Sequence, residues 1–235
     1  MTEKSDVPNP QGSAVRHFSY RATVIFRAII WTVPIVAGLG GWITWAGLNS
    51  PYTTHQDITL QQPIPFSHLH HVQGIGLDCR FCHASVDKSS FAGMPSTKTC
   101  MTCHSQVWTN APMLKPVRDS WREGKPIQWV RVHNLPDFVF FNHEAHVTHG
   151  MGCVTCHGQV DDMPLMRQAS PLTMAWCLNC HRNPEKYVRP REEVFNMRFK
   201  PEDINQTQAS LGPKLVDQYH IRSARNLTDC ATCHR

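Results

Sequence analysis

The sequence contains five Cys-x-x-Cys-His motifs, and together they use all ten of its cysteines. Two thiols three positions apart can add to the two vinyl groups of one haem, and the histidine that follows then lies close enough to bind the iron as its proximal ligand. The pattern therefore predicts five covalently bound haem c groups. The predicted thioether cysteines are Cys79 and Cys82, Cys100 and Cys103, Cys153 and Cys156, Cys177 and Cys180, and Cys230 and Cys233, and the predicted proximal ligands are His83, His104, His157, His181 and His234.

Two other uses of ten cysteines explain less of this pattern. Structural zinc sites combine Cys-x-x-Cys pairs, but five pairs divide badly into four-cysteine sites. A disulfide framework suits cysteines outside the cytosol. Neither of these requires a histidine directly after every pair, so the haem interpretation is favoured.

The motifs belong to a repeat with a period of about 75 residues. The intervals between the first cysteines of successive motifs are 21, 53, 24 and 53 residues. Residues 66–104 and 141–181 form two units, each with a Phe-x-His-x-x-His segment followed by two motifs, and residues 219–235 form a partial third unit. At one offset of 75 residues, Phe66, His68, His71 and Val72 match Phe141, His143, His146 and Val147, and the cysteines follow at 74 after a single deletion.

The two histidines of each Phe-x-His-x-x-His segment are candidate distal ligands. Histidines three positions apart lie on one side of a helical turn, and low-spin haem iron takes a sixth ligand, commonly His or Met. This arrangement resembles the cytochrome c3/c7 class, in which the first histidine serves the haem bound just downstream and the second serves another haem. The resemblance implies that His68 binds the first haem and His143 the third. It also implies that His71 and His146 reach neighbouring haems, those of the second and fourth motifs.

A fifth distal ligand has two main candidates, His133 and His220. His220 precedes Cys230 by ten residues, as His143 precedes Cys153 in the second unit. Met174, three residues before Cys177, is an alternative thioether ligand, and Met113 is another. The histidines that are not predicted to bind haem are His17, His55, His70 and His149.

Residues 28–48 form an uncharged segment of 21 residues, which as a helix is about 31 Å long and can cross a bilayer. Arg16, Arg21 and Arg27 precede it, and the next basic residue is Arg80. The positive-inside rule therefore predicts a cytoplasmic segment 1–27 and an extracytoplasmic cytochrome domain 49–235. A cleaved signal peptide is the alternative, but its apolar region is normally 7–15 residues and ends at an Ala-x-Ala-like site. We therefore predict an uncleaved, single-pass anchor.

The composition of the chain predicts a mainly α fold with extensive loops around the cofactors. The formal net charge of +5 would suggest an anionic partner such as nucleic acid. Five haems bring ten propionates, however, which lower the net charge of the ferrous protein to about −5 if all are ionised. The basic residues are better interpreted as counter-charge for the propionates, and no nucleic-acid partner is predicted.

Two longer stretches carry a more specific resemblance. RVHNLPDFVFFNHEAHV (131–147) and LTMAWCLNCHRNPE (172–185), together with the N-terminal helix and the five motifs, resemble the pentahaem cytochrome subunit of alternative complex III, a bacterial quinol:electron-acceptor oxidoreductase. The resemblance implies three kinds of partner: an iron–sulfur/molybdopterin-like subunit, polytopic quinol-binding membrane subunits and a monohaem cytochrome c. It also favours His133 as the fifth distal ligand, because His133 lies inside the first stretch.

The number of histidines favours an electron carrier over an enzyme. A haem enzyme needs an open coordination position, whereas a carrier fills both axial positions. We therefore predict an electron-transfer subunit of the bacterial inner membrane, with no catalytic residues of its own, that relays electrons from a quinol-oxidising complex to a periplasmic acceptor or oxidase. A self-contained quinol dehydrogenase of the small membrane-anchored multihaem type is the main alternative. A catalytic pentahaem reductase often uses a Cys-x-x-Cys-Lys motif, which this sequence does not contain.

Overall fold

The computed structural model describes residues 19–234, and they divide into two compact units between Leu48 and Asn49. Residues 1–18 of the predicted cytoplasmic segment, His17 among them, lie outside the described residues. The first unit consists of one long helix and the second of many short ones, and each is described by itself.

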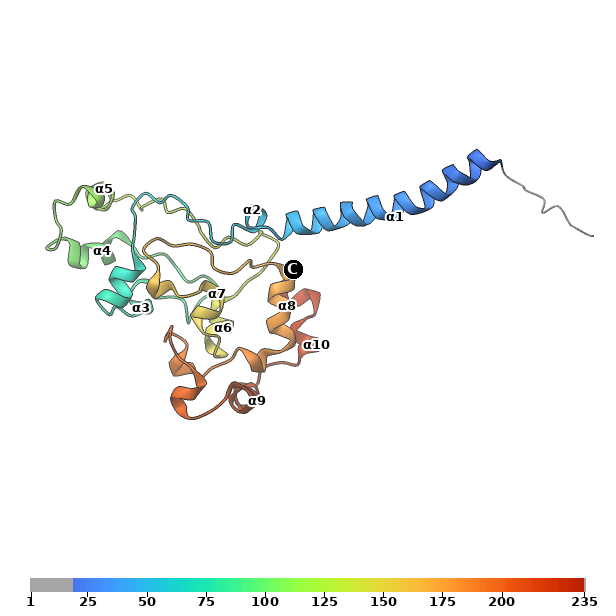
Figure 1. The fold of residues 1–235 in the computed structure, drawn as a ribbon. Helices are drawn as coiled ribbons and strands as arrows, with labels where there is room; N and C mark the ends of the chain where they lie inside the picture. The colour runs from blue at the N-terminus through green and yellow to red at the C-terminus, as the bar shows by residue number, and fades with distance from the viewer. Residues whose placement is uncertain (1–18, 235) are drawn as a thin grey trace, which may run out of the picture. The chain divides into compact units, whose positions relative to one another are not determined.

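The first unit is helix α1 (Tyr20–Leu48), the one helix among residues 19–234 that is long and apolar enough to cross a membrane (Figure 1). Helix α1 begins eight residues before the predicted membrane span. The apolar sequence defines only the part of the helix that can lie in lipid, not where the helix itself begins. Backbone hydrogen bonding continues through Arg21 and Arg27. No residue of α1 is buried, so its apolar side chains are not part of a protein core.

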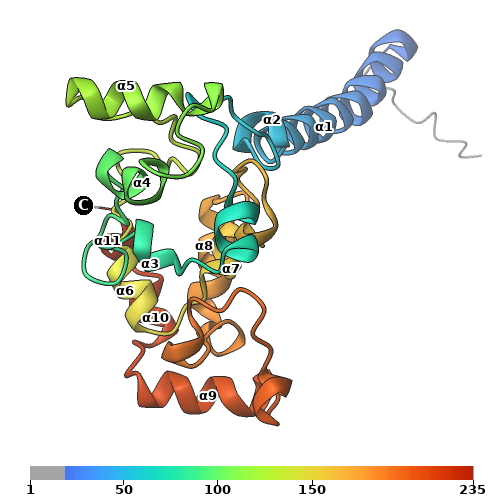
Figure 2. The same ribbon diagram turned by 90° about the vertical axis from the view of Figure 1, so that its left-hand side faces the viewer.

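The second unit contains ten short helices in the described part of the chain, joined by loops and single turns (Figure 2). No β-strand occurs between residues 19 and 234; the extended segments form only isolated bridges. The predicted mainly α fold is therefore confirmed. The helices are α2 (Pro51–Thr54), α3 (Cys79–Cys82), α4 (Thr97–His104), α5 (Lys115–Glu123), α6 (His143–Thr148), α7 (Cys153–His157), α8 (Met174–Arg182), α9 (Gln208–Gln218), α10 (Ala224–Leu227) and α11 (Cys230–Cys233).

The apolar core of the second unit is small and lies in two separate clusters. One joins α9 to the segments around Val188 and Phe199, and its members are Val188, Phe199, Leu211, Leu215 and Tyr219. The other joins Ile64 to Leu114 and Val117, and it packs against Cys100 and Met101 of α4. Clusters of this size stabilise only their own neighbourhood, as expected of a domain in which cofactors provide much of the buried apolar surface.

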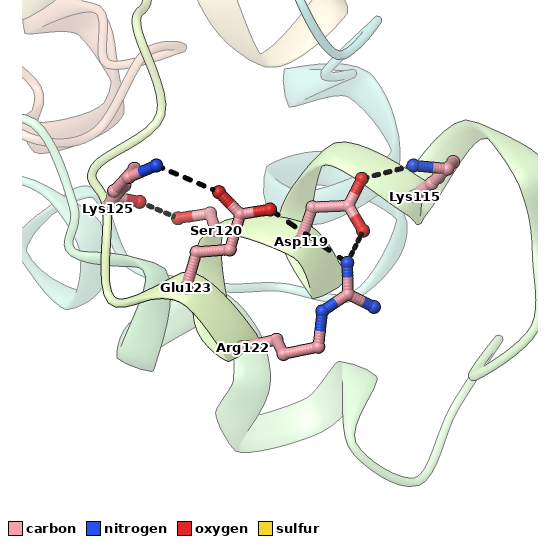
Figure 3. Close-up of polar contacts among 6 residues, drawn as sticks. All are labelled: Lys115, Asp119, Ser120, Arg122, Glu123 and Lys125. Carbon is pink, nitrogen blue, oxygen red and sulfur yellow. Dashed lines mark hydrogen bonds and ion pairs between the residues drawn. The ribbon is translucent and has the colours of Figure 1, made fainter.

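Helix α5 supports the second motif with one face and carries charges on the other. Val117 is buried against the α4 cluster, and the hydroxyls of Ser120 and Thr97 are 2.6 Å apart. On the exposed side, Arg122 binds Asp119 at 2.7 Å (Figure 3). Exposed pairs of this kind contribute little to stability because water screens them, so packing on α4 is the main role of α5. The polar network consists of Lys115, Asp119, Ser120, Arg122, Glu123 and Lys125.

The two repeat units differ by one residue, and the backbone differs at the same place. The histidine segment of the second unit is α-helical in α6, whereas the matching segment of the first unit, Leu69–Gly74, is a π-helix. A π turn holds one residue more than an α turn. The first repeat unit has one residue more than the second, and the π-helix lies in the part of the first unit where this residue is added. Gly76 and Gly150, each three residues before a cysteine, have almost the same φ, 79° and 78°.

Backbone hydrogen bonds between distant segments position the histidines. The Phe140 amide donates to the carbonyl of Cys233 at 2.8 Å, which places the fifth motif beside residues 138–140. The His143 amide donates to the carbonyl of Ser90 at 3.2 Å, so the start of α6 lies beside the loop after the first motif. Loops rather than sheets therefore set the relative positions of the motifs.

Candidate haem-binding sites

Each Cys-x-x-Cys-His motif lies on a helix or a helical turn, which brings its two thiols and its histidine to one side. Asp78 caps the first of these helices, accepting a hydrogen bond from the Arg80 amide at 2.8 Å, and Asp229 caps the last one in the same way. All ten cysteines lie in the described region, and none forms a disulfide. Burial raises the pKa of Cys153 to about 11 and that of Cys156 to about 12.

Four of the five motif histidines donate Nδ1–H to a backbone carbonyl. The acceptors are the carbonyls of Gly93 for His83 (2.9 Å), Val107 for His104 (3.2 Å), Leu227 for His181 (3.0 Å) and Phe138 for His234 (3.1 Å). A carbonyl can only accept, so the hydrogen of each neutral ring is on Nδ1 and the lone pair is on Nε2. Hydrogen bonds of this kind fix the tautomer and the orientation of metal-binding histidines.

Three repeat histidines face three motif histidines at nearly equal distances. The ring centroids are 6.2 Å apart for His71 and His104, 6.3 Å for His143 and His157, and 6.0 Å for His146 and His181. Two imidazoles on opposite sides of one metal have centroids about 6 Å apart, from two metal–nitrogen bonds of about 2 Å each and about 1 Å from each nitrogen to its ring centre. The spacing of all three pairs fits two histidines that share one iron.

The repeat histidines of these pairs also have the tautomer that metal binding needs. Nδ1 of His71 donates to the carbonyl of Ser67 at 2.8 Å, and Nδ1 of His146 donates to the carbonyl of Asn142 at 2.7 Å. His143 makes the equivalent bond to Ser90 at 3.1 Å. In each ring, Nε2 therefore carries the lone pair.

His68 is half-buried and lies near His83. Burial, with smaller effects of the neighbouring His83 and His71, lowers the pKa of His68 to about 4. Its Nδ1 is buried without a hydrogen-bond partner in the described structure. In the sequence, His68 and His83 occupy the positions in the first repeat unit that His143 and His157 occupy in the second.

Two phenylalanines that sequence reasoning treated only as repeat markers contact both histidines of their units. Phe66 stacks on His71 (4.4 Å, 24°) and meets His68 edge-on (4.9 Å, 84°). Phe141 stacks on His146 (4.5 Å, 24°) and meets His143 edge-on (4.7 Å, 88°). The agreement between the units indicates that the phenylalanine fixes both imidazole planes. The repeat itself, which kept Phe at this position, was the signal for this role.

The candidates for a fifth distal ligand are placed differently from the three pairs. His133 is in direct contact with His157, with ring centroids 4.3 Å apart. His220 is exposed after α9 and has a left-handed φ of 51°. Met174, the alternative ligand, is exposed at the start of α8. In the described residues, none of these three has a ring contact with His234.

Burial keeps several of these histidines neutral, which iron binding requires. Desolvation lowers the pKa of His157 to about 3 and that of His133 to about 4, and it also lowers the pKa of His71, His143 and His146. A neutral imidazole keeps a lone pair on one nitrogen, whereas a protonated one has none.

Comparison with known proteins agrees with this geometry. Residues 145–235, which hold the last three motifs, match the family model of cytochrome c3, so this part of the chain is similar to a cytochrome c3. A curated relative, the menaquinone reductase multihaem cytochrome c subunit of Nitratidesulfovibrio vulgaris (strain Hildenborough), is 39% identical over 124 residues, which are 52% of this chain and 55% of the relative. The chain thus spans about half the length of the relative that it matches. Both similarities imply covalently bound haem c.

Proposed function

We propose that this chain is a membrane-anchored pentahaem cytochrome that relays electrons from a quinol-oxidising membrane complex, of the alternative complex III type, to a periplasmic acceptor or a terminal oxidase. The chain is not an enzyme on its own in this proposal. The ten motif cysteines hold five haems, the five motif histidines bind the irons from one side, and repeat histidines bind from the other.

The observation that carries the proposal is the set of three imidazole pairs 6.0–6.3 Å apart. An iron with two histidines has no position left for a substrate, and its ligands move little when its charge changes, which suits rapid electron transfer. Haem iron supplies one-electron chemistry when it is bound.

The chain's own residues hold and orient these groups. His68 and His83 are proposed for the first haem, His71 and His104 for the second, His143 and His157 for the third, and His146 and His181 for the fourth. His234 is proposed for the fifth haem, with His220 as its distal ligand, because the ten-residue spacing to Cys230 repeats that of His143 to Cys153.

Helix α1 is proposed to anchor the chain in the inner membrane, with the N-terminus in the cytoplasm and the haem domain outside. The charge asymmetry around residues 28–48 supports this orientation. Ala37 and Gly41 form a small-xxx-small pair on α1, a face that allows a helix of a partner subunit to approach closely. The proposed partners are polytopic quinol-binding subunits, an iron–sulfur/molybdopterin-like subunit and a monohaem cytochrome c.

The name of the curated relative favours a second candidate, in which the same relay works in the opposite direction. That relative is a subunit of a menaquinone reductase. Electrons would then pass from a periplasmic donor through the haems toward menaquinone. The fixed bis-histidine geometry suits either direction, so the two candidates differ in the partners and not in the cytochrome.

The test is purification of the tagged full-length chain in mild detergent from its native membrane. The pyridine haemochrome assay should give five haems per chain, and the polytopic and iron–sulfur subunits should co-purify. Stopped-flow mixing with menaquinol should reduce the haems in the complex but not in the separated subunit. Two or three haems per chain would contradict the proposed ligand set. Rapid reduction of the separated subunit would instead favour a self-contained quinol dehydrogenase.

A further inference from the structure

His157 is the one motif histidine whose Nδ1 faces another histidine. His83, His104, His181 and His234 all donate to backbone carbonyls, whereas Nδ1 of His157 lies 3.3 Å from Nε2 of His133. The two rings are close and nearly perpendicular, with centroids 4.3 Å apart and an interplanar angle of 72°.

The tautomers of this pair follow from the role proposed for His157. If Nε2 of His157 binds iron, its hydrogen must be on Nδ1. Nε2 of His133 must then accept that hydrogen bond, and the hydrogen of His133 is on its own Nδ1. This arrangement uses the lone pair of His133.

The distance between His133 and His157 also indicates that His133 does not bind the iron held by His157. A separation of 4.3 Å between ring centres is too short for an iron between them, since the three facing pairs are 6.0–6.3 Å apart. His143 already faces His157 at 6.3 Å, so an iron held by His157 would have His143 as its second histidine ligand. His133 therefore lies outside the coordination sphere, on the far side of His157.

The surroundings of His133 suit a hydrogen-bond acceptor. His133 is partly buried, and its Nε2 faces Nδ1 of His157 at 3.3 Å. A buried Nδ1–H of His157 without an acceptor would carry a desolvation penalty of about 1–3 kcal/mol. Residue 133 thus supplies what a backbone carbonyl supplies to the other four motif histidines.

We propose that His133 is a positioning residue for the third haem: it fixes the orientation and tautomer of His157 and makes His157 a stronger electron donor to its iron. This inference rests on the proposed haem relay. An imidazole nitrogen is a better acceptor than an amide carbonyl, and a stronger hydrogen bond to Nδ1–H raises the basicity of the metal-binding nitrogen. Greater basicity stabilises the ferric state, so His133 lowers the reduction potential of the third haem.

The experiment compares His133→Leu, His133→Gln and His149→Leu in the full-length, haem-loaded protein. Leucine removes the acceptor, glutamine offers a carbonyl oxygen in its place, and His149 is a matched control whose Nδ1 donates to the carbonyl of Ala145 within α6. Electron paramagnetic resonance at low temperature reports the spin state of each haem, and potentiometric titration reports the reduction potentials.

We expect all haems of His133→Leu to remain low-spin, and the equilibrium constant for reduction of one haem to rise about tenfold, which is about 59 mV for one electron. His133→Gln should give a smaller shift in the same direction, and His149→Leu none. If His133→Leu does not fold, the glutamine variant carries the test. A new high-spin haem in either His133 variant would make His133 a distal ligand and overturn the inference, as would unchanged potentials in both. The haem count of the unaltered protein tests the proposed function separately.

Discussion

Gly150 connects helix α6, which carries His143 and His146, to the third motif in α7. Replacing Gly150 with alanine should destabilise the fold in two ways, through its backbone conformation and through its packing. Its φ is 78°, in the left-handed region that disfavours side chains. A Cβ atom at this position would lie 2.4 Å from the carbonyl oxygen of Arg189 and 2.9 Å from the ring of Tyr219. The Arg189 amide donates to the Gly150 carbonyl at 2.9 Å, so the backbone there has little freedom to move away.

The first repeat unit provides a matched control. Gly76 has a φ of 79°, but a Cβ atom there meets no described atom within 4 Å. Gly76→Ala should therefore show only the conformational cost of a left-handed residue, about 1–2 kcal/mol. Gly150→Ala should show the same cost and in addition a packing cost of about 1–3 kcal/mol for forcing a methyl group into filled space.

Thermal unfolding of the haem-loaded protein, followed by haem absorbance, measures the two costs. A loss of about 1 kcal/mol lowers Tm by about 2–4 °C in a chain of this size. Tm should thus fall by about 2–8 °C for Gly76→Ala and by about 4–20 °C for Gly150→Ala. Equal losses in the two variants would refute the reasoning, because they would mean that the contacts with Arg189 and Tyr219 do not restrict residue 150.

Three further predictions concern individual side chains. His146→Ala should convert one haem to high spin, a loss of about one fifth of the low-spin signal in electron paramagnetic resonance, because His146 is paired with His181. An unchanged spectrum would contradict this pairing. Phe141→Leu should keep all haems low-spin but alter the g-values of two of them, because Phe141 contacts both His143 and His146. Unchanged g-values would mean that the phenyl ring does not orient the two imidazoles. The side-chain hydrogen bond from Arg80 lowers the pKa of Asp78. The Asp78 cap therefore stabilises the fold at pH values above the usual aspartate pKa, and this stabilisation is lost as the pH falls through the lowered pKa. Asp78→Ala should lower the free energy of unfolding by about 1 kcal/mol at pH 7 and make that free energy less dependent on pH in the acid range.

The sequence alone determined the features that depend on local spacing. The five motifs and their order can be identified from the sequence, because thioether formation needs two thiols three positions apart. The apolar segment 28–48 likewise predicts its own helix, since a helix satisfies its backbone hydrogen bonds internally. The offset of 75 residues showed that both histidines recur in each unit, and the resemblance to the cytochrome c3/c7 class implied which motifs they serve. The fold places His71, His143 and His146 at 6.0–6.3 Å from the histidines of those motifs. The start of α1 at Tyr20 was not predicted, because hydropathy limits the membrane span and not the helix.

Only the tertiary structure decided which group accepts the hydrogen bond from Nδ1 of each motif histidine. The carbonyls that bind Nδ1 of His181 and His234 are 46 and 96 residues away in the chain, and no local pattern predicts them. The same holds for His133, which the sequence offered as a distal ligand and which the fold places against Nδ1 of His157, 24 residues away. Spacing along the chain fixes which groups can bind one haem. The path of the loops, which is set by contacts between distant segments, determines which groups orient those histidines.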